Sequence, residues 1–331
     1  MSNVPELVRV SLGSAVALGL AIAKLDALPT TIYLMTHKKG KCVANCLFCP
    51  QARESRGRAD MLSRISWPVF KTSPVIEHIR QSFENGHIHR VCIQSLNYPE
   101  VFAHVTSIVK AIAERSSIPI SVSCQPLNTE NLKLLADAGA ERIGIPLDAA
   151  TEALFETIKG AKAGGPYVWK DQFRLLEEAA HVFGKEKVST HLIVGLGETD
   201  KQITNLIQEL ADNGVLPALF AFTPIPGTFL EVLSQPPIQT YRRLQVARYL
   251  IVNGDSRIEN MGFDDEQHLV SFGIDEHELL GIVRSGKPFL TSGCAACNRP
   301  YYNEKPSGPI YNYPKQLTES DINIVIEQLR I

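Results

Sequence analysis

Three cysteines lie close together in the segment CVANCLFC, residues 42–49. The C-x3-C-x2-C spacing lets Cys42, Cys46 and Cys49 face one metal centre from a single loop. A four-iron cluster has four corners, so three thiolates leave one iron free to bind something other than protein. A zinc site completed by a distant ligand such as His37 is the alternative, although zinc ribbons use two C-x2-C pairs. The spacing therefore favours an iron-sulfur cluster with an open iron.

The chain has seven cysteines, and the other four are Cys92, Cys124, Cys294 and Cys297. Four further thiols are the full complement for a second cluster, and an odd total does not suggest a disulfide framework. Cys294 and Cys297 lie in a C-x2-C pattern within a Gly/Asn/Pro-rich stretch, which favours a metal or redox role. Cys92 and Cys124 lie in apolar segments, where a cysteine is as often a small core residue. We hypothesise that all four share one site.

The reactive segments must be positioned by a large folded core. Short β-rich segments alternate with helical patterns, as in βα units. Strands are predicted over residues 31–36, 90–95, 118–124, 142–146, 188–194 and 218–222, with weaker candidates over 257–259 and 288–290. Helices are predicted over residues 73–84, 99–114, 128–138, 151–158, 170–183, 200–213 and 239–252.

This order predicts an α/β fold, a TIM-type (βα) barrel, full or partial, with an N-terminal helix and a C-terminal cluster-binding tail. We expect residues 1–29 to form an N-terminal helical extension and residues 30–292 to form the barrel. Residues 293–331 would form the tail, with its C-x2-C pattern and a closing helix. Single barrels of this kind run past about 250 residues, so the length does not require a second large domain.

In such a barrel the reactive residues gather at the C-terminal ends of the strands. The first cysteine loop follows the strand over residues 31–36, Cys92 lies late in the next strand, and Cys124 ends the third. Asp148 follows the fourth strand, and residues 195–198 follow the fifth. The sequence therefore predicts one mouth that holds two metal centres.

Charge and hydropathy exclude several kinds of partner. The 33 basic and 35 acidic residues give a net charge of −2, which offers no electrostatic footprint for nucleic acid. Residues 10–23 form an uncharged run that superficially resembles a signal peptide, but they are too few to span a bilayer. We predict a buried or barrel-capping helix there and no membrane partner. An oxygen-labile cluster would require a reducing compartment, so we expect a cytoplasmic protein.

With Phe48 directly before the last cysteine, CVANCLFC resembles the signature of the radical S-adenosylmethionine (SAM) enzymes. The resemblance implies that Phe48 lies beside SAM and that the open iron chelates its methionine end. An electron from the cluster would then cleave SAM to a 5'-deoxyadenosyl radical. The segment HLIVGLGET, residues 191–199, is similar to the family's fifth-strand G-x-I-x-G-x-x-E motif in its biotin-synthase-like form, with His191 replacing the first glycine.

By this resemblance Ile193 packs on adenine, and Gly195 and Glu198 belong to the same SAM-binding motif. Gly195 and Gly197 let the backbone approach a ligand closely, although a tight strand-to-helix turn is the alternative. Asp148, in the segment IPLD, is similar to the acid that binds the SAM ribose, although it could instead cap the next helix.

Two further segments look like SAM-binding segments of the family. Ser95 occupies the place where the family's backbone takes the methionine amino group, but the usual Gly-Gly-Glu is absent. Pro226 lies in PIPGT, residues 224–228, which resembles the sixth-strand adenine-binding loop.

The subfamily follows from the remaining cysteines. Cys92 and Cys124 are placed like two auxiliary-cluster cysteines of biotin synthase, but Ser189 stands where the third is expected. The auxiliary arginine of that enzyme has no clear match in residues 257–263. The tail, from Cys294 to the segment GPIYNYP at residues 308–314, resembles the two-component lipoyl synthases, which are biotin-synthase-like proteins.

This resemblance implies an auxiliary iron-sulfur cluster of the [4Fe-4S] type, held by Cys92, Cys124, Cys294 and Cys297 and consumed as sulfur donor. It implies sulfur insertion into an octanoyl chain on a lipoyl carrier protein or domain. A second radical SAM lipoyl synthase subunit and an electron donor such as ferredoxin would be partners. Biotin synthase, or another sulfur-inserting radical SAM enzyme, is the alternative. A non-catalytic zinc-bearing module is the rival from another class.

Overall fold

The computed structural model describes residues 4–126 and 128–330. Within these ranges, an eight-stranded sheet has the order β10-β9-β8-β7-β6-β2-β1-β5. From β2 to β10, neighbours in this order are parallel and follow the chain order. These strands are β2 (Thr31–Thr36), β6 (Arg90–Gln94), β7 (Ile120–Ser123), β8 (Arg142–Gly144), β9 (Val188–Val194) and β10 (Val215–Ala221).

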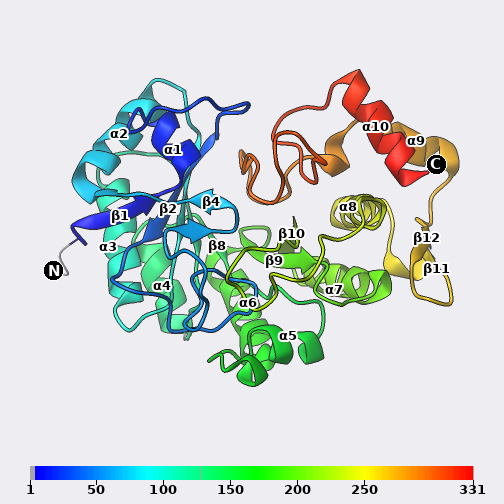
Figure 1. Cartoon of the computed structure of the whole chain (residues 1–331), viewed down its shortest axis with the longest axis horizontal. Helices are drawn as coiled ribbons and strands as arrows, with labels where there is room; N and C mark the ends of the chain where they lie inside the picture. The colour runs from blue at the N-terminus through cyan, green and yellow to red at the C-terminus, as the bar shows by residue number, and fades with distance from the viewer. Residues whose placement is uncertain (1–3, 127, 331) are drawn as a thin grey trace.

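Helices alternate with these parallel strands along the chain and cover the outer face of the sheet, as Figure 1 shows. They are α2 (Thr72–Glu84), α3 (Val101–Ala113), α4 (Thr129–Asp137), α5 (Glu152–Ile158), α6 (Trp169–Phe183), α7 (Asp200–Asp212) and α8 (Ile238–Asn253). The α7 helix begins where Thr199 and Gln202 form a capping box. The predicted strand-helix alternation is confirmed, with small shifts at the ends, and the fold is a partial TIM-type barrel.

The two weaker strand predictions are wrong. Residues 257–259 and 288–290 fall mainly in short 3-10 helices, η2 (Ile258–Asn260) and η3 (Lys287–Phe289). Pro288 lacks a backbone N–H and cannot donate to a sheet ladder. The parallel run therefore ends at β10, and the barrel remains open on that side.

The first residues add a strand as well as a helix. The strand β1 (Leu7–Val10) pairs antiparallel with β2 and with β5 (Val69–Lys71). The predicted helix is shorter than expected, α1 (Leu12–Ala17), and begins after Ser11, whose side chain caps it. The prediction of a purely helical N-terminal extension is therefore wrong, because β1 belongs to the main sheet. The three-part division of the chain otherwise stays a prediction.

The C-terminal tail spans the open side of the barrel (Figure 1). The Thr31 hydroxyl of β2 donates to the carbonyl of Ala296, and the Leu219 N–H of β10 donates to Ser292 Oγ. The tail thereby joins the two sides that the sheet leaves apart. It is framed by α9 (Glu276–Arg284) and by α10 (Glu319–Leu329), which packs on α8 and α9.

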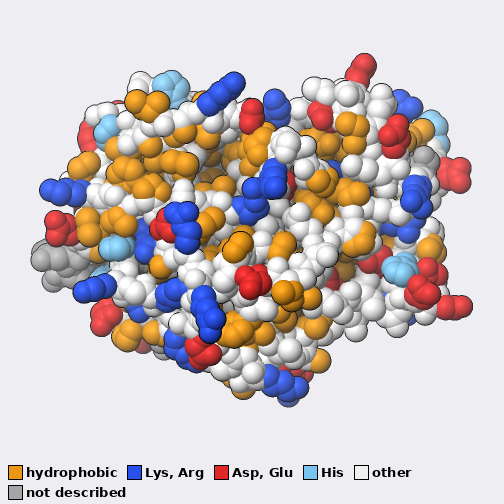
Figure 2. Space-filling view, in the orientation of Figure 1, with side chains coloured by type: hydrophobic (Ala, Val, Ile, Leu, Met, Phe, Trp, Pro, Cys, Tyr) orange, Lys and Arg blue, Asp and Glu red, His pale blue; other side chains and the backbone are white. Residues whose placement is uncertain are grey.

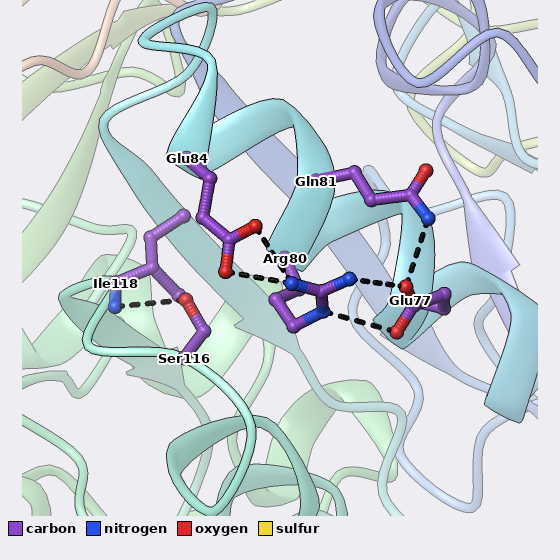
Figure 3. A network of polar contacts seen from close by, with 6 residues as sticks. All are labelled: Glu77, Arg80, Gln81, Glu84, Ser116 and Ile118. Carbon is purple, nitrogen blue, oxygen red and sulfur yellow. Dashed lines mark hydrogen bonds and ion pairs between the residues drawn. The ribbon is translucent and has the colours of Figure 1, made fainter.

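The outer surface of α2 carries a network of exposed ion pairs (Figure 3). Arg80 pairs with Glu77 and with Glu84, each at 2.6 Å, and Gln81 also donates to Glu77. Such pairs contribute little to stability because water screens them, so α2 is held mainly by its buried face. In the described part of the chain, no helix is long and apolar enough to cross a membrane.

Candidate functional site

A cavity of about 230 Å³ lies inside the barrel, at the C-terminal ends of the parallel strands. The three cysteines of the first loop reach it, and so do residues predicted to bind SAM. These lining residues are Cys42, Cys46, Cys49, Phe48, Ser95, Asp148 and Ile193. The structure thus brings together residues that lie far apart in the sequence, while their individual ligand roles stay predictions.

The first cysteine loop is fastened by hydrogen bonds around its turn. The Lys41 Nζ atom donates to three backbone carbonyl oxygens in residues 50–57, at 2.8, 2.5 and 2.7 Å. The N–H of Asn97 donates to Cys42 Sγ at 3.1 Å. Cationic donors form stronger hydrogen bonds than neutral ones, so Lys41 holds the loop that carries the thiols.

The thiols of this loop affect one another. Burial raises the pKa of Cys49 to about 12, and the neighbouring Cys42 adds to that shift. Burial also raises the pKa of Cys46 well above its usual range, and Cys49 again adds to the shift. A metal that binds the deprotonated sulfurs offsets the cost of ionising buried thiols. This donor set therefore fits an iron-sulfur cluster.

A single metal ion is a different case. Across residues 4–126 and 128–330, no three His, Cys, Asp or Glu side chains stand close enough together to surround one ion. The thiolates of a cluster bind separate irons and so stand farther apart than the ligands of a lone ion.

Asp148 points into the cavity as part of a buried ion pair. Its Oδ2 atom lies 2.7 Å from Lys159 Nζ, which also donates to the carbonyl of Pro146 at 2.8 Å. The backbone of Asp148 has a φ of +67°, a left-handed conformation that Asp tolerates better than most residues. The helix-capping alternative is wrong, since Thr151 caps α5. Lys159 was missed because no local motif marks it.

An apolar wall lies beside Asp148, where the N–H of Ile193 donates to the carbonyl of Asp148 at 2.8 Å. Phe48 and Ile193 pack against Phe222 in one cluster. Ile225 also lines the cavity, whereas Pro226 is exposed, and the SAM-binding role predicted for Pro226 stays a prediction. The carbonyl of the next residue, Gly227, accepts hydrogen bonds from the N–H groups of residues 56 and 57 and so joins this segment to the cysteine loop.

Gly195 and Glu198 form the tight turn that was the alternative for this motif. The Glu198 carboxylate accepts from the N–H groups of Gly195 and Leu196 at 2.6 and 3.0 Å. Gly195 has a φ of +102°, and a Cβ there would lie 3.1 Å from Pro236. Neither Gly195 nor Glu198 is among the described residues that line the cavity. They end β9 sharply, while the SAM-binding role predicted for them stays a prediction.

His191, which replaces the motif's first glycine, does reach the cavity. Its ring centroid lies 4.8 Å from that of Phe220. Burial lowers the pKa of His191 to about 4, so the imidazole is neutral near pH 7.

A second group of thiols, the second thiol site, comprises Cys92, Cys294 and Cys297. Burial, and then the neighbouring Cys294 and Cys297, raise the pKa of Cys92 well above its usual range. The Cys297 Sγ atom lies 3.4 Å from Tyr33 Oη. Cys124 lines the main cavity instead, and burial alone raises its pKa to about 12. The structure thus joins three of the four predicted auxiliary ligands.

Arg299, which the motif analysis missed, lies near both sites. It lines the main cavity, and its guanidinium lies 3.7 Å from the ring centroid of Phe220. It donates to the carbonyl of Ser292 at 2.7 Å. Burial raises the pKa of Cys297, while the charge of Arg299 opposes that shift. Its place two residues after Cys297 was the available signal.

Comparison with known sequences agrees with this site. The pattern of the Radical SAM superfamily matches residues 39–210. The biotin synthase of Chlamydia pneumoniae is 29% identical over 224 residues, which cover 65% of this chain and 62% of that protein. The biotin synthase of Magnetococcus marinus is 23% identical over 231 residues, which cover 68% of this chain and 67% of that protein. The chain therefore spans less than two thirds of the first of these relatives.

The fold is also found among solved structures. The crystal structure of HydG, a maturase of the [FeFe]-hydrogenase, matches with a TM-score of 0.52 and 14% identity. That match covers 72% of this chain and 57% of HydG. At this identity the likeness concerns the fold alone.

Proposed function

Because the chain belongs to the radical SAM superfamily, we propose that it inserts sulfur at an unactivated C–H bond of its substrate. Cys42, Cys46 and Cys49 would hold the SAM cluster, and the second thiol site would hold an auxiliary cluster. When bound, the first cluster with SAM supplies a 5'-deoxyadenosyl radical that removes a hydrogen atom, and the auxiliary cluster supplies sulfur. The proposal depends on one observation: the barrel holds two separate sets of cysteines, the first cysteine loop and the second thiol site, and Arg299 lies near both.

Side chains of the cavity would position SAM. The Asp148 carboxylate, held by Lys159, can accept hydrogen bonds from two ribose hydroxyls. Phe48 and Ile193 offer an apolar wall on which adenine can pack. An unactivated C–H bond has no acidic proton, so acid-base side chains alone are inadequate. The side chains that line the cavity would also exclude water from the radical.

The substrate is either a small molecule or an acyl group on a carrier protein, and the known relatives favour the small molecule. Relatives named biotin synthase support a small substrate of the dethiobiotin type. An octanoyl chain on a lipoyl carrier, handled with a second radical SAM subunit, is supported by the tail, which supplies Cys294 and Cys297 to the barrel. Ser189 of β9 also supports the lipoyl carrier, because it stands where biotin synthase is expected to have its third auxiliary cysteine. Its buried hydroxyl donates to the carbonyl of Ile143.

The surface near the first cysteine loop favours an acidic electron donor such as a ferredoxin. Residues 37–64 contain seven Lys or Arg and two Asp or Glu, in a chain of net charge −2. Figure 2 shows basic side chains over the part of the molecule where Figure 1 draws this segment. Complementary charge would steer a negatively charged redox protein to the cluster.

The test is anaerobic incubation with SAM, a reductant, and either dethiobiotin or an octanoyl-lysyl carrier. We expect deoxyadenosine with both reagents present and a thiolated product from only one substrate. Cys42→Ala should abolish both products, whereas Cys294→Ala should spare SAM cleavage and abolish sulfur transfer. Deoxyadenosine without any thiolated product from either substrate would reject sulfur insertion, and no deoxyadenosine at all would reject the SAM site.

A further inference from the structure

The imidazole of His191 lies inside the barrel without a polar partner. It lines the cavity and is only partly buried, so the exposed part of the ring faces that cavity. Within residues 4–126 and 128–330, neither ring nitrogen of His191 has a hydrogen-bond partner. Polar groups in protein interiors are nearly always hydrogen-bonded, so an unpartnered imidazole at a cavity indicates a place where a ligand binds.

The strand β9 sets the depth of His191 in the barrel. Alternate residues of a strand point to the same face, so His191 and Ile193 both face the cavity. A strand rises about 3.3 Å per residue, which places His191 about 7 Å farther than Ile193 from the mouth at the C-terminal ends of the strands. Ile193 belongs to the apolar wall on which adenine can pack. A ligand that reaches His191 therefore lies deeper in the barrel than the adenine of SAM.

The surroundings of His191 connect the two reactive sites. The ring centroid of Phe220 lies 4.8 Å from that of His191 and 3.7 Å from the guanidinium of Arg299. Burial raises the pKa values of thiols in the second thiol site, and the nearby charge of Arg299 opposes that rise. On the SAM side, the N–H of Asp148 donates to the carbonyl of His191 at 2.7 Å. His191 therefore lies between the residues predicted to bind SAM and the second thiol site.

The charge of His191 restricts the kind of group that it can bind. Burial lowers its pKa to about 4, so the imidazole is neutral near pH 7 and has one N–H donor and one acceptor nitrogen. Carboxylates and phosphates bind more strongly to cationic donors. A neutral amide or urea group offers both a carbonyl oxygen and an N–H, and so it can satisfy either nitrogen of the ring.

Packing alone does not account for an imidazole at this position. The motif that residues 191–199 resemble has a glycine here, which has no side chain to contact a ligand. An apolar side chain would pack on Phe220 without leaving two ring nitrogens unpartnered. The polar ring is therefore a feature of this chain that a ligand contact explains.

We propose that His191 binds the substrate through a neutral amide-type group and holds the reacting C–H bond between SAM and the second thiol site. The inference rests on the proposed function, because it names a contact that positions the substrate of sulfur insertion. Dethiobiotin carries such a group as a cyclic urea, and an octanoyl-lysyl carrier carries it as an amide. The two sources are separate arms of the test.

The test uses full-length protein, reconstituted anaerobically and supplied with SAM but no reductant, so that the substrate binds without turnover. Isothermal titration calorimetry gives the Kd of dethiobiotin in one arm and of an octanoyl-lysyl carrier domain in the other. His191→Leu removes both ring nitrogens and keeps an apolar side chain. We expect this variant to bind the substrate of the wild-type protein about tenfold more weakly, with its affinity for SAM unchanged.

Further variants separate hydrogen bonding from packing. His191→Asn and His191→Gln place an amide near one ring nitrogen or the other, so at least one of them should recover most of the lost affinity. His191→Phe keeps the packing on Phe220 and should bind the substrate as weakly as His191→Leu. His277→Leu, at an exposed position, is the control and should bind like the wild type. Circular dichroism on each variant checks that the barrel is folded.

Two results would overturn the inference while the proposed function stands. Wild-type substrate affinity in His191→Leu or His191→Phe would show that the ring only packs. An equal loss of affinity for SAM and for the substrate would instead place His191 at the SAM site.

Failure of the proposed function gives a different result. In that case the wild-type protein binds SAM but neither dethiobiotin nor the octanoyl-lysyl carrier domain. The substrate contact of His191 would then be rejected together with sulfur insertion into these substrates.

Discussion

The Nζ atom of Lys159 lies 2.7 Å from Oδ2 of Asp148, with only 1% and 10% of the two side chains exposed. Removing two charges from water is costly, and a hydrophobic pair of similar volume is often as stable. The pair therefore points to a role at the cavity, where Lys159 holds the Asp148 carboxylate in one orientation. The cation also lies 4.9 Å from the ring centroid of Tyr167, which restricts its position further.

Replacing Lys159 by Met should leave the Asp148 charge buried without its partner. We expect the free energy of unfolding to fall by about 3–5 kcal/mol and SAM binding to weaken. Urea unfolding and equilibrium dialysis with SAM measure the two effects. Lys162→Met, at an exposed position three residues away, is the control. Wild-type SAM affinity in the Lys159 variant would contradict the assigned role.

Replacing Lys41 by Gln should loosen the first cysteine loop. Each hydrogen bond from a charged donor contributes about 1.5–3 kcal/mol, and Lys41 makes three to backbone carbonyls. We expect faster loss of iron to a chelator, with the fold intact by circular dichroism. Lys39→Gln, on an exposed side chain of the same segment, should release iron at the wild-type rate. Equal rates in both variants would show that Lys41 does not hold the loop.

Replacing Gly227 by Ala tests the contact between the loop after β10 and the cysteine loop. Gly227 has a φ of +82°, and a Cβ there would lie 2.4 Å from the backbone nitrogen of Gly57. Gly254→Ala is a matched control, since its φ is +78° and no atom lies within 4 Å of its Cβ. Left-handed backbone alone costs about 1–2 kcal/mol. Unfolding experiments should therefore give a larger loss of stability for Gly227→Ala than for the control.

Stability should fall with acidity through His191. Its pKa is 6.5 when exposed and about 4 in the fold, so the unfolded chain binds the extra proton between these values. The free energy of unfolding therefore has its full value above pH 6.5, and it decreases as the pH falls towards 4 because protonation of His191 favours the unfolded chain. Between pH 7.5 and 5.5 this loss amounts to about 1.4 kcal/mol. Urea unfolding at both pH values should show a smaller loss for His191→Asn, and an unchanged pH dependence would count against burial as the cause.

Local patterns in the sequence were sufficient for the parallel strands and for the first cysteine loop. The strands β2 and β9 have the predicted bounds, because each is an apolar, β-branched run bounded by turn residues. Asp148 was placed at the cavity because parallel strands end at one edge, so that residues following different strands meet there, whereas Ile193 came from the resemblance to a family motif. The tight turn of Gly195 and Glu198 was left open, since a glycine motif serves a turn and a ligand equally well.

The sequence by itself determined the donor types, the (βα) order and the grouping of Cys42, Cys46 and Cys49, since eight successive residues cannot separate widely. Only the tertiary structure decided that Lys159 faces Asp148 and that Cys297 meets Tyr33. The latter contact depends on the strand register and on the path of a tail that returns across the open barrel. Register and chain path are set by packing of the whole core, and no spacing between neighbours in the sequence encodes them.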